Sequence, residues 1–191
     1  VISCASCTTN SITPVVEIIG RVFGIQKAIL TTIHGYTANQ GIVDQPSKAW
    51  VRGRAAAINI VPTTTGAAVA TTKALPQYKG KFDGIAVRVP TPVGSVSDLT
   101  FLTEKDTTVE EIQNALREGA EGKYKGVMAV TEVPFVSTDI IGDPHGSIVD
   151  LAMTKVVDGN LVTGQNQNAG PMVAREMMQL LVAQTAKVTT S

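Results

Sequence analysis

Segments rich in β-branched residues recur along the chain, but they do not alternate strictly with helical segments. Strict alternation would predict a parallel, doubly wound sheet, whereas mixed order favours an α+β fold. We therefore predict a mostly antiparallel, mixed sheet with helices on one face. The expected strands are residues 25–33, 84–90, 95–104, 126–132 and 147–157.

Helical patterns occupy the segments between these strands. In residues 6–19 apolar side chains recur at helical spacing after Ser6, a plausible N-cap, and Gly20 is the expected end of that helix. Thr108-Val109-Glu110-Glu111 has the spacing of a capping box, which predicts a helix beginning there. Further helices are expected at 67–75 and 171–187, and a long polar loop at 35–54.

Composition excludes several classes of protein. Hydrophobic residues make up 43% and charged residues 17%, which is typical of a globular chain rather than a disordered one. The 16 basic and 16 acidic residues give a formal net charge of zero. The sequence has no basic stripe of the kind that binds nucleic acid, so we expect no nucleic-acid partner. No apolar run approaches the roughly 18 residues that span a bilayer, so we expect no membrane partner. Two cysteines are too few for a disulfide scaffold.

Cys7 is the most reactive residue that the sequence predicts. It would lie in the first turn of a helix, where free N–H groups and the helix dipole favour a thiolate. His34 ends the strand that follows this helix, and a helix that packs back on that strand would bring the two side chains together. We therefore predict a Cys7–His34 pair. The alternative is that Cys7 is a small buried residue and His34 a hydrogen-bonded loop residue.

Cys4 and Cys7 also form a C-x-x-C motif, which admits two other hypotheses. A thioredoxin-like redox pair requires a β–α unit before the motif, and nothing precedes it here. A zinc site requires four ligands, whereas the chain holds two Cys and two His residues. We expect no metal.

Hydroxyl and cationic side chains predict two anion sites. Thr65 and Gly66 precede a helix, where hydroxyls and N–H groups can hold a phosphate, and Ser6 and Thr8 add hydroxyls near Cys7. Arg88 points away from its apolar neighbours and is the expected cation of a second anion site. The alternative for the three threonines before Gly66 is a strand end followed by an N-cap.

Four motifs in this order resemble those of a known family: Ser6-Cys7-Thr8-Thr9-Asn10, Thr31-Thr32-Ile33-His34-Gly35-Tyr36-Thr37, Pro62-Thr63-Thr64-Thr65-Gly66-Ala67-Ala68 and Arg88-Val89-Pro90-Thr91-Pro92. Over about residues 1–163 the chain resembles the catalytic part of glyceraldehyde-3-phosphate dehydrogenase, of the phosphorylating bacterial type. The resemblance implies a glycolytic, cytoplasmic homotetramer that oxidises an aldehyde phosphate with NAD. Alternatives are an enzyme similar to erythrose-4-phosphate dehydrogenase, or a non-enzymatic fragment that self-associates through the sheet face and the loop.

The resemblance also implies roles for the motif residues. Cys7 would attack the aldehyde, and His34 would take the proton of the hemithioacetal and then assist acyl transfer. Inorganic phosphate would then convert the thioester to an acyl phosphate. The attacking phosphate would be held by Ser6, Thr8, Thr65 and Gly66, and the substrate's own phosphate by Thr37 and Arg88.

The cofactor and the domain organisation are further implications. Asn168 is the nearest match to the family's asparagine that orients the nicotinamide. The family places a Rossmann domain before its catalytic cysteine, whereas this chain opens Val1-Ile2-Ser3-Cys4 and contains no G-x-G-x-x-G. We therefore expect a fragment that does not bind NAD alone. Residues 1–163 would form the catalytic domain, and 164–191 a segment and helix that would pack on the absent dinucleotide-binding domain.

Overall fold

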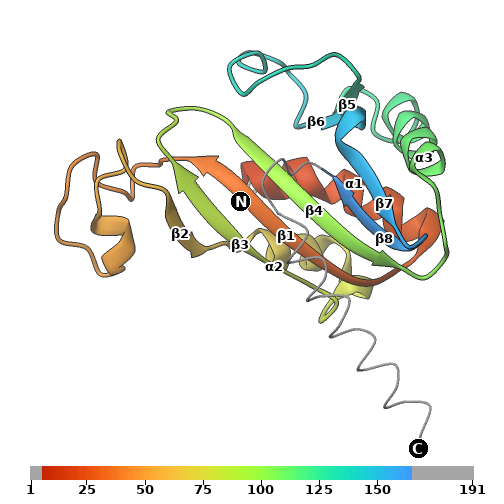
Figure 1. Ribbon diagram of the computed structural model, residues 1–191, viewed down its shortest axis with the longest axis horizontal. Coiled ribbons are helices and arrows are strands. Elements are labelled where there is room, and N and C mark those ends of the chain that lie inside the picture. The colour runs from red at the N-terminus through yellow and green to blue at the C-terminus, as the bar shows by residue number, and fades with distance from the viewer. Residues whose placement is uncertain (1–5, 165–191) are drawn as a thin grey trace, which may run out of the picture.

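A computed structural model describes residues 6–164 of the chain (Figure 1). These residues form a six-stranded sheet, a separate two-stranded sheet and three α-helices. The elements in chain order are α1 (Cys7–Phe23), β1 (Ile25–Gly35), η1 (Trp50–Gly53), β2 (Val61–Thr64), α2 (Ala67–Ala74), η2 (Pro76–Tyr78), β3 (Phe82–Val89), β4 (Ser95–Thr103), α3 (Val109–Glu121), β5 (Met128–Thr131), β6 (Ser147–Asp150), η3 (Leu151–Met153), β7 (Thr154–Val157) and β8 (Leu161–Gly164).

The larger sheet is mixed and mostly antiparallel, as predicted. Its strand order is β2-β3-β1-β4-β8-β7, and only β1 and β3 run parallel to each other. The smaller sheet is a parallel pair of β5 and β6. Helices α1 and α2 lie behind the larger sheet in Figure 1, so the α+β prediction with helices on one face is confirmed.

The core lies between α1 and the helix-facing side of the sheet. Alternate residues of β1 point into it, among them Ala28 and Leu30, while the intervening Ile29 is 44% exposed on the open face. His34 lies on the same face of β1 as these residues but is only partly buried, and it lies in register with Arg88 of β3. The strand register therefore places an imidazole and a guanidinium side by side on the helix-facing side.

The capping box forms as predicted. The hydroxyl of Thr108 accepts a hydrogen bond from the backbone N–H of Glu111 at 3.2 Å, and the Glu111 carboxylate accepts one from the backbone N–H of Thr108 at 2.9 Å. The helix that begins there buries Ile112 and Leu116 against the core.

The predicted end of the first helix is wrong. Helix α1 continues through Gly20 to Phe23 and is capped by Gly24, whose φ of 74° favours glycine. Gly20 serves a different purpose, because a Cβ there would lie 1.9 Å from the Tyr78 hydroxyl. It is a point of close approach inside the helix and not a stop signal.

The predicted strand over residues 147–157 is interrupted. The Asp150 carboxylate accepts a hydrogen bond from the backbone N–H of Ala152 at 3.0 Å, which stabilises the turn of η3 between β6 and β7. The chain thereby passes from the small sheet to the large one. Strand β8 was not predicted, and β2 was expected only as the alternative strand end before Gly66; each has four residues.

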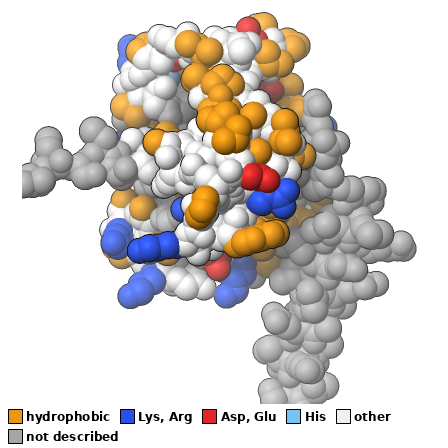
Figure 2. Space-filling view, turned by 90° about the vertical axis from the view of Figure 1, so that its left-hand side faces the viewer, with side chains coloured by type: hydrophobic (Ala, Val, Ile, Leu, Met, Phe, Trp, Pro, Cys, Tyr) orange, Lys and Arg blue, Asp and Glu red, His pale blue; other side chains and the backbone are white. Residues whose placement is uncertain are grey.

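Exposed hydrophobic side chains gather on the long loop over residues 36–60. Figure 2 faces this end of the molecule and shows several separate groups of hydrophobic side chains on its surface. Those of the loop itself include Val43 at 71%, Trp50 at 72% and Ile58 at 80% exposure. Of the helices in residues 6–164, none is both long and apolar enough to cross a membrane.

Candidate active site

The Cys7 thiol and the His34 imidazole are in contact. Cys7 is the first residue of α1, and the Ser6 hydroxyl caps the helix by accepting a hydrogen bond from the backbone N–H of Thr9 at 3.0 Å. Cys7 Sγ lies 3.2 Å from His34 Nε2, and Cys7 is exposed. The contact arises because β1 runs back along α1 and ends beside the start of the helix. The alternative of a buried, inert Cys7 does not describe this arrangement.

The other ring nitrogen of His34 is also engaged. Nδ1 lies 2.6 Å from the backbone oxygen of Gly35 and 2.8 Å from Arg88 Nη1. Arg88 Nη1 in turn donates a hydrogen bond to the same Gly35 oxygen at 3.0 Å. The imidazole is therefore held from both sides, by a thiol at one nitrogen and by a guanidinium and a carbonyl at the other.

A second arginine completes a cationic site. Burial lowers the pKa of Arg88 below its usual range and the charge of Arg52 lowers it further, whereas Cys7 acts in the opposite direction. The Nε of Arg52, in η1, donates a hydrogen bond to the Thr63 hydroxyl of β2 at 3.0 Å. Within the described part of the chain neither arginine forms an ion pair with a carboxylate. This pair of guanidinium groups can bind an anion.

Sequence reasoning missed Arg52 as a site residue. The sequence feature that could have indicated a role for Arg52 is its position as a basic residue in a long polar loop, close to Gly53 and Arg54. Arg54 has a different environment, because its Nε lies 3.3 Å from the Asp44 carboxylate and its guanidinium lies over the Trp50 ring. Spacing alone does not distinguish the two arginines.

The predicted phosphate-binding residues lie at the N-termini of two neighbouring helices. Ser6 and Thr8 begin α1, and Gly66 is the N-cap of α2, where the Thr65 hydroxyl accepts a hydrogen bond from the backbone N–H of Ala67 at 3.1 Å. β2 ends at Thr64 and Gly66 caps α2. The alternative prediction for the three threonines, a strand end followed by an N-cap, therefore describes their local structure.

The two helices are linked through their side chains. The hydroxyls of Thr13 in α1 and Thr71 in α2 lie 3.3 Å apart. No hydrogen bond joins the two N-terminal groups themselves within residues 6–164. A Cβ at Gly66 would meet no atom within 4 Å, so the space beside α2 is open.

A cavity of about 950 Å³ opens beside the thiol–imidazole pair. Cys7, His34 and Thr37 line it, and the Thr37 hydroxyl donates a hydrogen bond to Asn39 Oδ1 at 2.5 Å. The cavity does not include Arg88, which contacts His34 from the other side. Its other walls include residues of α1, β4, α3, β6, β8 and the loop before β6.

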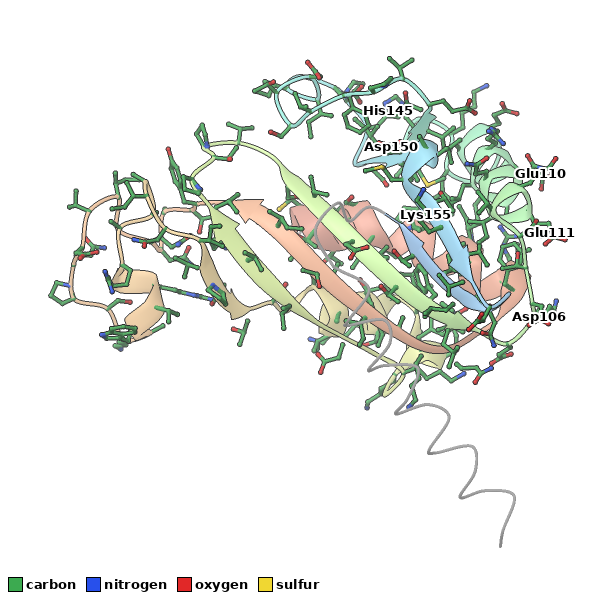
Figure 3. The ribbon with its side chains drawn as sticks, in the orientation of Figure 1. Asp106, Glu110, Glu111, His145, Asp150 and Lys155 are labelled. Carbon is green, nitrogen blue, oxygen red and sulfur yellow. The ribbon has the colours of Figure 1, made fainter. Side chains whose placement is uncertain are left out.

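The second histidine of the chain also lines this cavity. His145 Nδ1 lies 2.8 Å from Asp143 Oδ1, and the backbone N–H and ring of His145 hold the pKa of Asp143 below its usual range. Figure 3 labels His145, just before β6, and Asp150, the last residue of β6, whereas Glu110 and Glu111 lie on α3. In residues 6–164, no three His, Cys, Asp or Glu side chains are grouped closely enough to hold a metal ion.

Two predicted features lie outside the described residues. They are Asn168, assigned to the nicotinamide, and the helix expected at 171–187.

The fold and the site together define a class of protein: an α+β domain that presents a cysteine at a helix N-terminus to an imidazole and an arginine. The sequence profile of the family described as Glyceraldehyde 3-phosphate dehydrogenase, C-terminal domain, matches residues 6–165. The chain belongs to this family.

Individual relatives agree with this assignment. The chain is 51% identical over 162 residues to glyceraldehyde-3-phosphate dehydrogenase 2 of Streptomyces avermitilis, covering 85% of this chain and 48% of that protein. It is 51% identical over 158 residues to the glyceraldehyde-3-phosphate dehydrogenase of Mycolicibacterium smegmatis, covering 83% and 46%. The chain spans about half the length of the curated relatives it matches.

Proposed function

We propose that the chain carries the acyl-transfer chemistry of a phosphorylating, NAD-dependent glyceraldehyde-3-phosphate dehydrogenase of glycolysis, a cytoplasmic enzyme. The observation that carries this proposal is the 3.2 Å contact between Cys7 Sγ and His34 Nε2 at the N-terminus of α1. The names of the relatives support the substrate class.

In the proposed reaction Cys7 attacks the aldehyde carbon and forms a hemithioacetal. His34 removes the hydroxyl proton of this adduct through Nε2 as the C–H bond gives up its hydride, which leaves a thioester. An oxygen of inorganic phosphate then attacks the thioester carbon, and the Cys7 thiolate leaves. The product is an acyl phosphate, and the thiolate is ready for another cycle.

Two groups of residues are proposed to hold the two phosphates. Thr37 and Arg88 would bind the phosphate of the substrate, and this role is supported by the charges of Arg52 and Arg88, neither of which is paired with a carboxylate among residues 6–164. Ser6, Thr8, Thr65 and Gly66 would bind the attacking phosphate, supported by their position at two helix N-termini, where N–H groups and hydroxyls stabilise anions.

NAD would supply the hydride acceptor. The cavity beside Cys7 could admit a nicotinamide ring, but the sequence contains no Gly-rich phosphate turn, so residues 6–164 alone do not fit a dinucleotide. We propose residues 1–163 as the catalytic domain. Residues 164–191, including Asn168, would form a segment that packs on a dinucleotide-binding domain outside this sequence.

Self-association is part of the proposal. The open sheet face exposes Ile29 and Ile85, and the loop over residues 36–60 exposes Val43, Trp50 and Ile58. Monomeric proteins rarely expose contiguous apolar patches of large area, so we propose that these surfaces are buried in a homotetramer of the whole enzyme.

Acylation of the 191-residue chain by p-nitrophenyl acetate tests the chemistry without NAD. We expect an acetyl group on Cys7 by peptide mass spectrometry, and release of acetyl phosphate when inorganic phosphate is added. Cys7→Ser should abolish both, whereas Cys4→Ser, the matched control, should retain them. Acetyl phosphate formation that survives Cys7→Ser contradicts the proposal.

A further inference from the structure

One row of side chains along α1 leads from the Cys7 thiol into the core. Four residues at intervals of four line the cavity beside the thiol: Cys7, Ser11, Val15 and Ile19. Side chains with this spacing lie one above another on the same side of a helix. At a rise of about 1.5 Å per residue, the row is about 18 Å long. The cavity therefore follows the helix from its first residue well into its second half.

Strand β4 provides a second wall with the same change in character. Alternate residues of this strand line the cavity: Ser95, Ser97, Leu99 and Phe101. Ser95 lies in register with His34, whereas Phe101 lies in register with Ala28, nearer the start of β1. Both walls therefore change from hydroxyl-bearing side chains near the thiol–imidazole pair to hydrocarbon side chains further along.

Helix α3 lines the apolar part of the cavity. It packs on the second half of α1, where a Cβ added at Gly119 would lie 2.3 Å from Ile18 Cδ1. Ile112 and Leu116, which are 1% and 3% exposed, line the cavity from this helix. Protein interiors are close-packed, so a cavity of about 950 Å³ bordered by core side chains has the dimensions of a ligand site, typically about 300–1,000 Å³.

The ionisable side chains of the cavity lie outside this apolar part. Those among the described lining residues are Cys7, His34, Tyr36, His145 and Asp150. None of them belongs to β4, to α3 or to α1 beyond its first residue. A charged group would lose its hydration there without finding a partner, whereas a hydrocarbon chain would gain by leaving water. The cavity thus fits a ligand with a reactive carbonyl carbon at one end and a hydrocarbon chain at the other.

We propose that Cys7 also accepts unbranched acyl groups from thioesters, and that the hydrocarbon chain of the acyl group occupies the cavity along α1. Three bonds of an extended chain span about 3.3–3.6 Å, so the row from Cys7 to Ile19 is long enough for a chain of about twelve carbons. The occupant is therefore a medium-length acyl chain that is covalently attached to the thiol at the mouth of the cavity.

The proposed step is a thioester exchange. The Cys7 sulfur attacks the carbonyl carbon of the donor and forms a new C–S bond, and the C–S bond of the donor breaks. His34 Nε2, 3.2 Å from Cys7 Sγ, takes the proton of the Cys7 thiol and gives it to the leaving thiolate of the donor. One thioester replaces another, so the step consumes no oxidant or other co-reactant. This inference rests on the proposed function for its nucleophile and adds a second class of acyl donor.

A series of acyl donors that differ in chain length tests the inference. The full 191-residue chain, carrying Cys4→Ser so that Cys7 is its one thiol, is treated with the N-acetylcysteamine thioesters of acetic, butyric, hexanoic and octanoic acid. Mass spectrometry of the Cys7 peptide gives each acylation rate, which is divided by the rate of the same thioester with glutathione to remove differences in intrinsic reactivity. Each added methylene should raise this ratio about fourfold, the effect of burying one methylene group.

Two tryptophan variants locate the chain. Val15 lines the cavity about two turns beyond Cys7, so Val15→Trp should fill the path of the chain and sharply lower the ratio of octanoyl to acetyl transfer. Val69 lies on α2, is 59% exposed and does not line the cavity. Val69→Trp is therefore the matched control and should keep the chain-length dependence of the parent.

Two results would overturn the inference: a ratio that does not rise from acetyl to octanoyl in the parent, or an unchanged rise in a folded Val15→Trp. A flat series means that the cavity takes no acyl chain, whether it is closed or filled by another segment of the chain. The parent series decides this even if Val15→Trp does not fold. Acetyl transfer to Cys7 without chain-length dependence contradicts this inference alone, whereas a rising series without acetyl phosphate formation contradicts the proposed function alone.

Discussion

Cys7 Sγ and His34 Nε2 lie 3.2 Å apart although 27 residues separate them in the chain. The turn at Gly24 reverses the chain after α1, so that β1 returns along the helix and ends beside its first residue. Cys7 is the first residue of α1, so the positive end of the helix dipole lies near the sulfur. This geometry favours a thiolate with a hydrogen-bond donor beside it.

The contact predicts the reactivity of Cys7. His34→Ala should slow alkylation of Cys7 by iodoacetamide at pH 7 by about tenfold, because an unassisted thiol is only a few per cent thiolate at that pH. The rate is measured by mass spectrometry of the Cys7 peptide. His145→Ala, in the same cavity but without contact to Cys7, should leave the rate nearly unchanged. Equal rates in the parent and His34→Ala would show that the pair is not preorganised.

Glu17 predicts a dependence of stability on pH. Burial tends to raise the pKa of Glu17, but hydrogen bonds and charges from Lys123 and Arg21 outweigh it and hold the pKa below 4.5. A lowered folded-state pKa means that the stabilisation is complete above the unfolded value of about 4.5 and is lost as pH falls through the folded value. The free energy of unfolding should therefore decrease as the pH falls below about 4.5.

Glu17→Gln isolates this contribution. It should lower the free energy of unfolding at pH 7 by about 1–2 kcal/mol, since charged hydrogen bonds are lost but Lys123 remains solvated. Its urea midpoint should also vary less between pH 5 and pH 3 than that of the parent. Glu118→Gln, an exposed change on α3, should alter neither. Parallel pH profiles for Glu17→Gln and the parent would refute the assignment.

The capping box predicts a measurable helix contribution. Thr108→Ala removes the hydroxyl that accepts from the backbone N–H of Glu111, which should cost about 1 kcal/mol of unfolding free energy. Thr108→Ser keeps the acceptor and should recover most of that loss. Chemical denaturation monitored by circular dichroism measures both, and equal midpoints for Thr108→Ala and the parent would contradict the cap.

Gly20 predicts a substitution that is unfavourable although it raises helix propensity. In Gly20→Ala the new Cβ would lie 2.3 Å from Cζ of the buried Tyr78 ring, so we expect a loss of about 1–3 kcal/mol despite a propensity gain of up to about 1 kcal/mol. Combined with Tyr78→Leu, the same change should be less costly than it is alone. Additive losses in this double-mutant cycle, measured by urea denaturation, would exclude the predicted clash.

The absence of a Gly-rich turn in the sequence predicts the response to NAD. Isothermal titration calorimetry of the 191-residue chain with NAD should show no saturable binding in the micromolar range. Inorganic phosphate, titrated in the same way, serves as the control ligand for the arginine site. Saturable NAD binding would show that these residues form a dinucleotide site on their own.

Sequence patterns predicted the features that depend on nearby residues. The capping box follows from two residues three positions apart, and the Cys7–His34 contact follows from one helix and the next strand. Strand β8 was missed and β2 was offered only as an alternative, because four residues alone show little periodicity, whereas the equally short β5, β6 and β7 fall inside longer predicted segments. The roles of Gly35 and Arg52 were missed because they depend on tertiary register: β1 must align with β3 before Arg88 reaches the imidazole.

The central position of β1 has a consequence for folding kinetics. This strand pairs Ala28 with Phe82 on one side and Ile25 with Thr103 on the other, so both its partners are distant in sequence. Chains dominated by such non-local pairing close large loops before they gain contacts, and they fold slowly. During synthesis Cys7 and His34 leave the ribosome long before Arg88. The nascent chain therefore carries the Cys7 thiol and the His34 imidazole well before the sheet that positions the imidazole has formed.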